Sequence, residues 1–190
     1  LRLLSDNARK YGVEFLSYCL MTNHVHHLAI PKEVDSLRWT LQLSHQRYAE
    51  YVNCRNGWTG HLWQERFYSC AVDEDFLWTA IRYIERNPCE ARLAVHPSDY
   101  RWSSAAALCG LRADALLTKQ PELLSTLQSR GDWFDWLGQP SDHDKVSALR
   151  KATRSDRAVG SEAFLELIER TIGRSARQPK MGRPRKVEKR

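Results

Sequence analysis

The chain has 190 residues, and its 42% hydrophobic residues, with 7 tryptophans, are enough to bury a core. No stretch approaches the roughly 18 uninterrupted apolar residues of a membrane helix, and charged residues interrupt the first twenty positions. We therefore expect a cytoplasmic protein with neither a membrane span nor a signal peptide. Its 5 cysteines are scattered and form no CxxC pair, which is typical of ordinary thiols rather than of a disulfide framework or a zinc ribbon.

The net charge of +6 is concentrated at the C-terminal end of the chain. Residues 174–190 hold eight basic side chains and one acidic side chain, a local charge of +7, so the rest of the chain carries about −1. A nearly neutral body with a polybasic arm favours a polyanionic partner, most commonly nucleic acid. The alternative is a solvated tail that serves only solubility.

The first elements are predicted from hydrophobic spacing and from the residues that end each run. Residues 1–11 have helical periodicity up to Gly12, and because the chain opens on Leu1 we expect the natural protein to start earlier. Residues 13–20 and 24–30 are rich in β-formers, and the three residues between them have the length of a hairpin connection.

Three further elements follow the hairpin. A long helix is predicted from Asp35 or Ser36, either of which can cap it, to the Asn56-Gly57 break. His61 to Val72 is predicted to be a third strand, and the acidic residues 73–75 favour the start of a helix that runs to Asn87-Pro88. Shorter helical pieces follow residue 97, with a last amphipathic helix near residues 161–172.

This order predicts an α+β fold. Helix, strand, strand, helix and strand are what remains of a ferredoxin-like (RRM-like) β-α-β-β-α-β unit, an antiparallel sheet covered by helices, when its first strand is missing. A C-terminal helical extension and the basic tail would follow it. The missing strand pairs inside such a sheet, so we expect the remainder to be less stable than the whole unit.

A histidine pair is the first candidate for chemistry. Side chains alternate between the faces of a strand, so His24 and His26 should project together while His27 projects to the other face as a structural residue. Two imidazoles on one face can chelate one divalent ion. They can equally be a hydrogen-bonded surface pair.

A tyrosine and an asparagine form the second candidate. Tyr83 and Asn87 are four residues apart in the predicted helix, which places a phenol and an amide on one face. The alternative is an ordinary core or boundary tyrosine.

Three ordered motifs carry a family resemblance. Residues 21–26 read MTNHVH, residues 60–67 read GHLWQERF and residues 82–88 read RYIERNP. Together they resemble the REP-associated tyrosine transposases, which belong to the HUH single-tyrosine transposases. The resemblance spans about residues 1–108 and returns in the tail, where residues 182–186 read GRPRK.

The resemblance implies a function and a division of the chain. Residues 1–108 would be an N-terminally truncated catalytic domain, residues 109–173 a helical extension, and residues 174–190 a basic tail like an AT-hook. The expected activity is metal-dependent cleavage and rejoining of single-stranded hairpin DNA, through a 5′-phosphotyrosine, for DNA transposition. The oligomeric state, monomer or homodimer, stays open.

The resemblance also assigns roles to residues. His24 and His26 would be the HUH pair, Asn87 would complete the protein ligands of Mg²⁺ or Mn²⁺, and Tyr83 would attack DNA. The chemistry of these groups agrees, because two nitrogens and an amide oxygen leave positions open on an octahedral ion for a phosphate oxygen. The ion can then polarise the phosphate, and a phenol that is desolvated and held in line can attack it.

Several basic residues are candidates for contacts with DNA phosphates. Each competes with the alternative of a plain solvated charge: Arg47, Arg55, Arg66, Arg82, Arg86, Arg183, Arg185 and Lys186. Glu65 departs from the family pattern, in which glycine or a basic residue is more common, and adds a negative charge that Arg66 can offset.

The remaining aromatic and histidine residues have less specific interpretations. Trp58 and Trp63 could stack on unpaired bases, although burial in the core is favoured for Trp63. His45 is expected at the surface rather than as a ligand. The tail's Gly-Arg-Pro core could enter an A·T minor groove or attract phosphates generally.

Two other functional classes compete with the transposase. The first is a domesticated relative that binds hairpin DNA without cutting it, against which the complete set of four site residues speaks. The second is a small metal-dependent hydrolase that uses the two histidines, which leaves the tyrosine and the tail unexplained.

Overall fold

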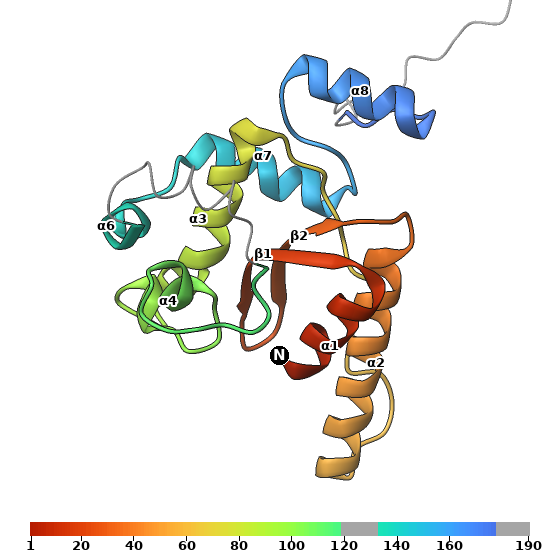
Figure 1. Ribbon diagram of the computed structural model, residues 1–190, viewed down its shortest axis with the longest axis vertical. Coiled ribbons are helices and arrows are strands. Elements are labelled where there is room, and N and C mark those ends of the chain that lie inside the picture. Colours follow the sequence, from red (N-terminus) through yellow and green to blue (C-terminus); the bar gives the residue numbers. More distant parts are fainter. Residues whose placement is uncertain (119–132, 178–190) are drawn as a thin grey trace, which may run out of the picture.

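The computed structural model describes residues 1–118 and 133–177. Helix α1 (Arg2–Tyr11) leads into the strands β1 (Val13–Leu20) and β2 (Val25–Pro31), then into helices α2 (Ser36–Asn56) and α3 (Glu74–Glu90). The first two helices lie side by side below the strands, and α3 lies on the opposite side of the hairpin (Figure 1). The structure confirms the predicted helices and the hairpin within a residue or a turn of the expected bounds.

The two strands form an antiparallel hairpin. Val13 pairs with Pro31 at the open end and Leu20 pairs with Val25 beside the turn, with an irregularity in register between Phe15 and Ser17. The backbone N–H of Met21 donates to the carbonyl of His24 at 2.8 Å, so the turn occupies residues 21–24. The turn ends at His24, immediately before the first residue of β2.

The helix boundaries follow local capping. Gly12 ends α1 and Gly57 ends α2, each with a positive φ that glycine adopts without strain. The Asp73 carboxylate accepts a hydrogen bond from the backbone N–H of Phe76 at 3.1 Å and caps α3. Asp35 occupies the N-cap position of α2 without a side-chain bond, and α3 continues through Pro88 to Glu90.

The predicted third strand, His61–Val72, is wrong. In the part of the chain that the structure describes, this segment is irregular, and Val72 alone forms a bridge, to Val159. A strand needs a neighbour along its length to satisfy its backbone groups, and the two strands of the hairpin do not provide one here. The segment instead runs along α2, where the indole N–H of Trp63 donates to the carbonyl of His45 at 3.0 Å.

Two apolar clusters form the core. The first joins α1, the inner face of β1 and α2, and contains Leu4, Ala8, Val13, Phe15, Tyr18, Leu41 and Leu116. The second packs α3 against the chain beyond it and contains Ile81, Ala105, Trp133 and Leu137. Of the apolar residues of α3, Ile81 and Ile84 are buried and Leu77 is half-buried.

A buried carboxyl group ties β1 to α3. Glu85 is fully buried, and both Ser17, at 2.6 Å, and Ser104 donate hydroxyl hydrogen bonds to its Oε1. Burial raises the pKa of Glu85 to about 7, against the lowering effect of the two hydroxyls. This cluster fixes the rotation of α3 relative to the hairpin.

The remaining described elements follow α3 in chain order. They are the single 3₁₀ turn η1 (Pro97–Asp99), α4 (Ala105–Leu108), α6 (Trp133–Gly138), α7 (His143–Arg154) and α8 (Glu162–Ile172). Helix α7 packs on α3, with Val146, Leu149 and Ala152 buried. Helix α8 lies at the far end of the molecule from α1 and α2, and none of its residues is buried (Figure 1).

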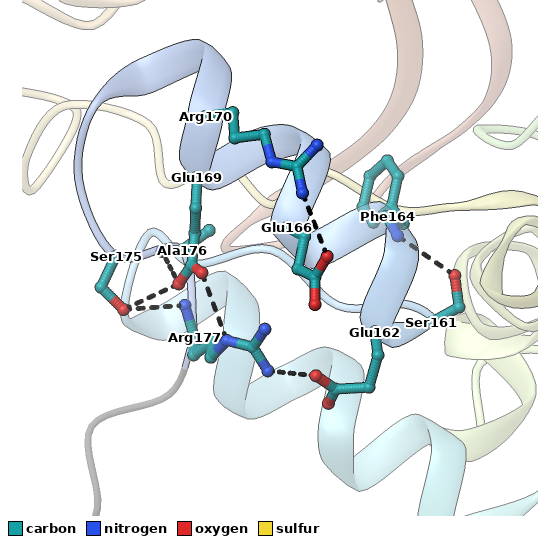
Figure 2. Close-up of polar contacts among 9 residues, drawn as sticks. All are labelled: Ser161, Glu162, Phe164, Glu166, Glu169, Arg170, Ser175, Ala176 and Arg177. Atoms are coloured by element: carbon teal, nitrogen blue, oxygen red, sulfur yellow. Dashed lines mark hydrogen bonds and ion pairs between the residues drawn. The ribbon is translucent and has the colours of Figure 1, made fainter.

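The chain after α8 folds back onto that helix, as Figure 2 shows. The guanidinium of Arg177 pairs with Glu169 at 3.3 Å and also with Glu162, and Glu169 accepts a further hydrogen bond from Ser175 at 3.1 Å. Arg177 belongs to the predicted basic tail. Its charge is neutralised within the fold.

The architecture is α+β, with a two-stranded antiparallel sheet packed on helices and additional helices toward the C-terminus. All 5 cysteines are free. No helix in residues 1–118 or 133–177 is long and apolar enough to cross a membrane.

Candidate active site

The histidine pair is assembled at the start of β2. His24 ends the hairpin turn and is exposed, while His26 lies in the strand and is partly buried. Their ring centroids are 4.8 Å apart with the planes nearly perpendicular. The two imidazoles lie together as the sequence predicts, although His24 belongs to the turn and only His26 to the strand.

Hydrogen bonding leaves one nitrogen of each ring open to a ligand. The Nδ1 of His24 is 2.7 Å from the side-chain oxygen of Asn23, so it acts as the donor and its Nε2 carries the lone pair. The Nε2 of His26 is buried, with no hydrogen-bond partner in the described residues. Desolvation, followed by the charges of His24 and Arg150, lowers the pKa of His26 to about 4. A neutral imidazole with an open nitrogen is a metal ligand.

Tyr83 lies beside this pair. It is carried by α3, which packs against both strands, and its ring centroid is 5.3 Å from that of His26. Its phenol oxygen accepts a long hydrogen bond of 3.4 Å from the Nε of Arg150, whose guanidinium carbon is 5.1 Å from the ring centroid. The phenol ring therefore has both a histidine and a cation from α7 as neighbours.

Asn87 is one turn further along α3 and is buried. Its Nδ2 donates to the backbone carbonyl of Tyr83 at 2.8 Å. This bond occupies the amide nitrogen and leaves the amide oxygen as the atom that could bind a cation.

The predicted DNA-binding arginines fall into two groups among the described residues. Arg82 and Arg86, on α3, bond to the end of α6 and to the chain after it: Arg86 donates to Leu137 O at 2.9 Å and Gly138 O at 2.8 Å, and Arg82 donates to Pro140 O at 3.4 Å. The guanidinium of Arg82 also stacks 4.0 Å from the Trp136 ring. These two side chains hold the C-terminal helices against α3.

The second group is exposed on and after α2. Arg47, Arg55 and Arg66 are all exposed, and the C-terminal half of α2 points away from α3 and α7 (Figure 1). None of the three forms a hydrogen bond or cation–π contact with Tyr83 in the described residues. Arg183, Arg185 and Lys186 lie outside the described residues.

The other singled-out side chains pack against neighbours. His27 is half-buried with both ring nitrogens inaccessible, edge-on to Phe15 with ring centroids 5.3 Å apart, and desolvation lowers its pKa to about 3. His45 is half-buried and stacks on Trp63, with centroids 4.2 Å apart. Trp63 therefore packs on α2 rather than in either core cluster, and Trp58 is exposed.

Sequence reasoning missed Arg150. It lies 67 residues beyond Tyr83, in a charged stretch with no motif. Only the packing of α7 on α3 brings its guanidinium to the phenol, so no local pattern could have revealed it.

Of the predicted metal ligands, His26 shows the feature that best fits a bound cation. No cluster of three or more His, Cys, Asp or Glu side chains occurs among the residues that the structure describes. The predicted set differs, because it combines two histidines with an amide. The buried, unpartnered Nε2 of His26 is the observation that fits a bound ion, since an orphaned buried nitrogen is costly otherwise.

A comparison with known families identifies the class. The family described as "Transposase IS200 like" matches residues 1–87, so this part of the chain belongs to the IS200-like transposases. That family includes the REP-associated tyrosine transposases, which confirms the predicted resemblance. Membership implies an enzyme that binds DNA and acts in DNA transposition. Neither the curated proteins nor the solved structures gave a match.

Proposed function

We propose that the protein cleaves and rejoins single-stranded, hairpin-forming DNA by transesterification through a 5′-phosphotyrosine at Tyr83. The observation that carries this proposal is the contact between the Tyr83 and His26 rings, whose centroids are 5.3 Å apart. The His24 ring in turn contacts the His26 ring. This arrangement supports the proposal because a phenol lies next to two imidazoles that each have a nitrogen without a hydrogen-bond partner in the described residues.

His24, His26 and the amide oxygen of Asn87 would hold Mg²⁺ or Mn²⁺. The family's nuclease chemistry is in general metal-dependent, which supports this assignment. The bound ion supplies Lewis-acid polarisation of the scissile phosphate. Nδ1 of His24, bonded to Asn23, keeps that imidazole in the tautomer that such a ligand requires.

Tyr83 performs the covalent step. Its phenol oxygen forms a bond to phosphorus, the bond from phosphorus to the 3′ oxygen breaks, and the phenol proton passes to solvent while the 3′ oxygen takes up a proton. The products are a 5′-phosphotyrosine and a free 3′ hydroxyl. Because the phosphodiester energy is retained in the protein link, the 3′ hydroxyl of a second strand can reverse the step and join DNA without ATP.

The proposed fold of the catalytic domain is ferredoxin-like. Helix α1, the hairpin and helix α2 have the order of the central part of that unit, and α3 is additional to it.

Tyr83→Phe tests the proposal, with Tyr68→Phe as the matched control. The change removes one oxygen, whose single contact in the described residues is the 3.4 Å bond from Arg150, so we expect unchanged stability and DNA affinity. Hairpin single strands are incubated with each protein and Mn²⁺, then separated on a denaturing gel. The wild type and Tyr68→Phe should give a covalent band, and Tyr83→Phe should give neither the band nor cleavage.

Two results would contradict this mechanism. A covalent 5′ complex with Tyr83→Phe would assign the nucleophile to another residue, Tyr100 being the next to test. Tight hairpin binding by the wild type without any cleavage would instead indicate a domesticated, non-catalytic DNA-binding protein.

A further inference from the structure

A small pocket opens beside Tyr83, between α3 and α7. It has a volume of about 70 Å³ and is lined by Tyr83, Arg86, Glu90, Ser141, His143, Val146 and Arg150. A buried water needs only about 15 Å³ measured in this way, so the pocket has room for a larger polar group. The family match ends before its α7 wall begins.

Two residues of the pocket lining carry hydrogen-bond donors that lack acceptors. The hydroxyl of Ser141 and the Nε of Arg86 are buried, and neither has a hydrogen-bond partner in the described residues. Arg150 uses one of its five donors on Tyr83 and forms no ion pair in the described part of the chain. Unsatisfied donors on residues that line one space favour an anionic acceptor with several oxygens.

The charges around the pocket also favour an anion near Tyr83. Arg86 and Arg150 are cationic, and Glu90 is the one acidic residue of the lining. Glu90 is seven residues beyond Tyr83 on α3, about 10 Å along the helix axis at 1.5 Å per residue. Arg150, by contrast, contacts the phenol oxygen itself.

We propose that this pocket is a phosphate-binding site in which Arg150 holds the scissile DNA phosphate against Tyr83. The inference rests on the proposed function and extends it to a residue of the C-terminal helices. Once the phenol oxygen bonds to phosphorus, the non-bridging oxygens of that phosphate come within reach of a guanidinium already 3.4 Å from the phenol. A planar fork of N–H donors matches two phosphate oxygens, which a point charge cannot do.

The packing of α7 explains how a remote segment reaches the site. Arg82 and Arg86 flank Tyr83 on α3 and bond to the chain that leads into α7, while Leu149, next to Arg150, is buried. Arg82 and Arg86, which the sequence predicts to contact DNA, would thus act indirectly by positioning the helix that carries Arg150.

Variants at Arg150 test the inference, with Arg154→Gln as the matched control. Arg150 and Arg154 are both exposed on α7, but only Arg150 lines the pocket. Arg150→Gln should slow formation of the covalent adduct in single turnovers on the order of 100-fold, the scale of losing one preorganised donor. Arg150→Lys should slow it by a smaller factor, and Arg154→Gln should match the wild type, with similar melting temperatures throughout.

A second measurement needs no DNA cleavage. Inorganic phosphate is exchanged for chloride at constant ionic strength, and the melting temperature is followed. The wild type and Arg154→Gln should gain equal stability from phosphate, and Arg150→Gln should gain less. An equal gain in Arg150→Gln would overturn the inference, as would an unchanged adduct rate. If the wild type forms no adduct at all, the proposed function fails, and the phosphate measurement still decides whether Arg150 binds phosphate.

Discussion

At the scale of single residues, the candidate active site depends on which nitrogen or oxygen atom of each side chain has no hydrogen bond and can bind a ligand. Asn87 illustrates this, because its amide nitrogen is bonded to the Tyr83 carbonyl of the same helix. This hydrogen bond therefore fixes the orientation of the amide, so that its oxygen is free to bind a cation. His26 also has a free atom, because its Nε2 is buried away from water and has no hydrogen-bond partner in the described residues.

Replacing Asn87 by alanine should weaken the response to metal without removing the nucleophile. We expect the Mn²⁺ concentration for half-maximal adduct formation to rise roughly tenfold or more, because a lost ligand is only partly replaced by water. The measurement is a Mn²⁺ titration of adduct formation, with Asn53→Ala, on α2, as the control. An unchanged titration would exclude Asn87 as a ligand, and activity that survives excess chelator would exclude the metal altogether.

At the scale of elements, the start of α3 is coupled to the start of α8. The Asp73 carboxylate caps α3 through the N–H of Phe76 and also accepts a 2.6 Å hydrogen bond from the N–H of Ser161. Nearby, where the chain before α8 passes the chain before α3, the backbone N–H of Val159 donates to the carbonyl of Ala71. One aspartate thus holds together two segments that are 88 residues apart.

Gly160 makes this crossing possible, and Gly160→Ala should loosen it. An added Cβ would lie 2.6 Å from Asp73 Oδ2 and 2.7 Å from the Phe164 ring, so the aspartate must move away from both of its donors. We expect a loss of about 1–3 kcal/mol in the free energy of unfolding, from overpacking together with a weakened cap. Urea denaturation measures it. Gly110→Ala would be a poor control, since its positive φ adds strain of its own; Ala163→Ser, exposed on α8, is suitable.

The predicted strand His61–Val72 shows how elements depend on neighbours. Its aromatic residues and Val72 favour a strand, although the polar residues 64–66 interrupt the apolar pattern. A strand forms only where another backbone accepts its hydrogen bonds, and among the described residues that contact is limited to Val72 with Val159. A helix satisfies its own backbone, which is why the predictions for α1, α2 and α3 were confirmed more fully.

At the scale of the whole molecule, the basic charge is divided between the fold and the tail. Arg177 is paired with Glu162 and Glu169 on α8, as Figure 2 shows, so it is not available to DNA without breaking these contacts. Residues 178–190 carry six more basic side chains, including Arg183, Arg185 and Lys186. They are the predicted arm for DNA.

Deleting residues 178–190 should flatten the salt dependence of binding to single strands. With a slope of about 0.7 per phosphate neutralised, six cations account for up to about 4 in the slope of log affinity against log salt. Replacing only Arg183, Arg185 and Lys186 by glutamine should remove up to about half of that. Fluorescence anisotropy at several salt concentrations measures the slope, and an unchanged slope would mean that the arm does not contact DNA.

The sequence by itself determined the elements whose hydrogen bonds are local, namely α1, the hairpin, α2 and α3, together with the pairing of His24 with His26. It also carried the motifs that identify the family over residues 1–87. Only the tertiary structure decided that His61–Val72 is not a strand, that Arg82 and Arg86 seat the C-terminal helices, and that Arg150 reaches Tyr83. The physical reason is range: caps and periodicity act within a few residues, whereas the contact of α7 with α3 depends on burial between segments about sixty residues apart in the chain.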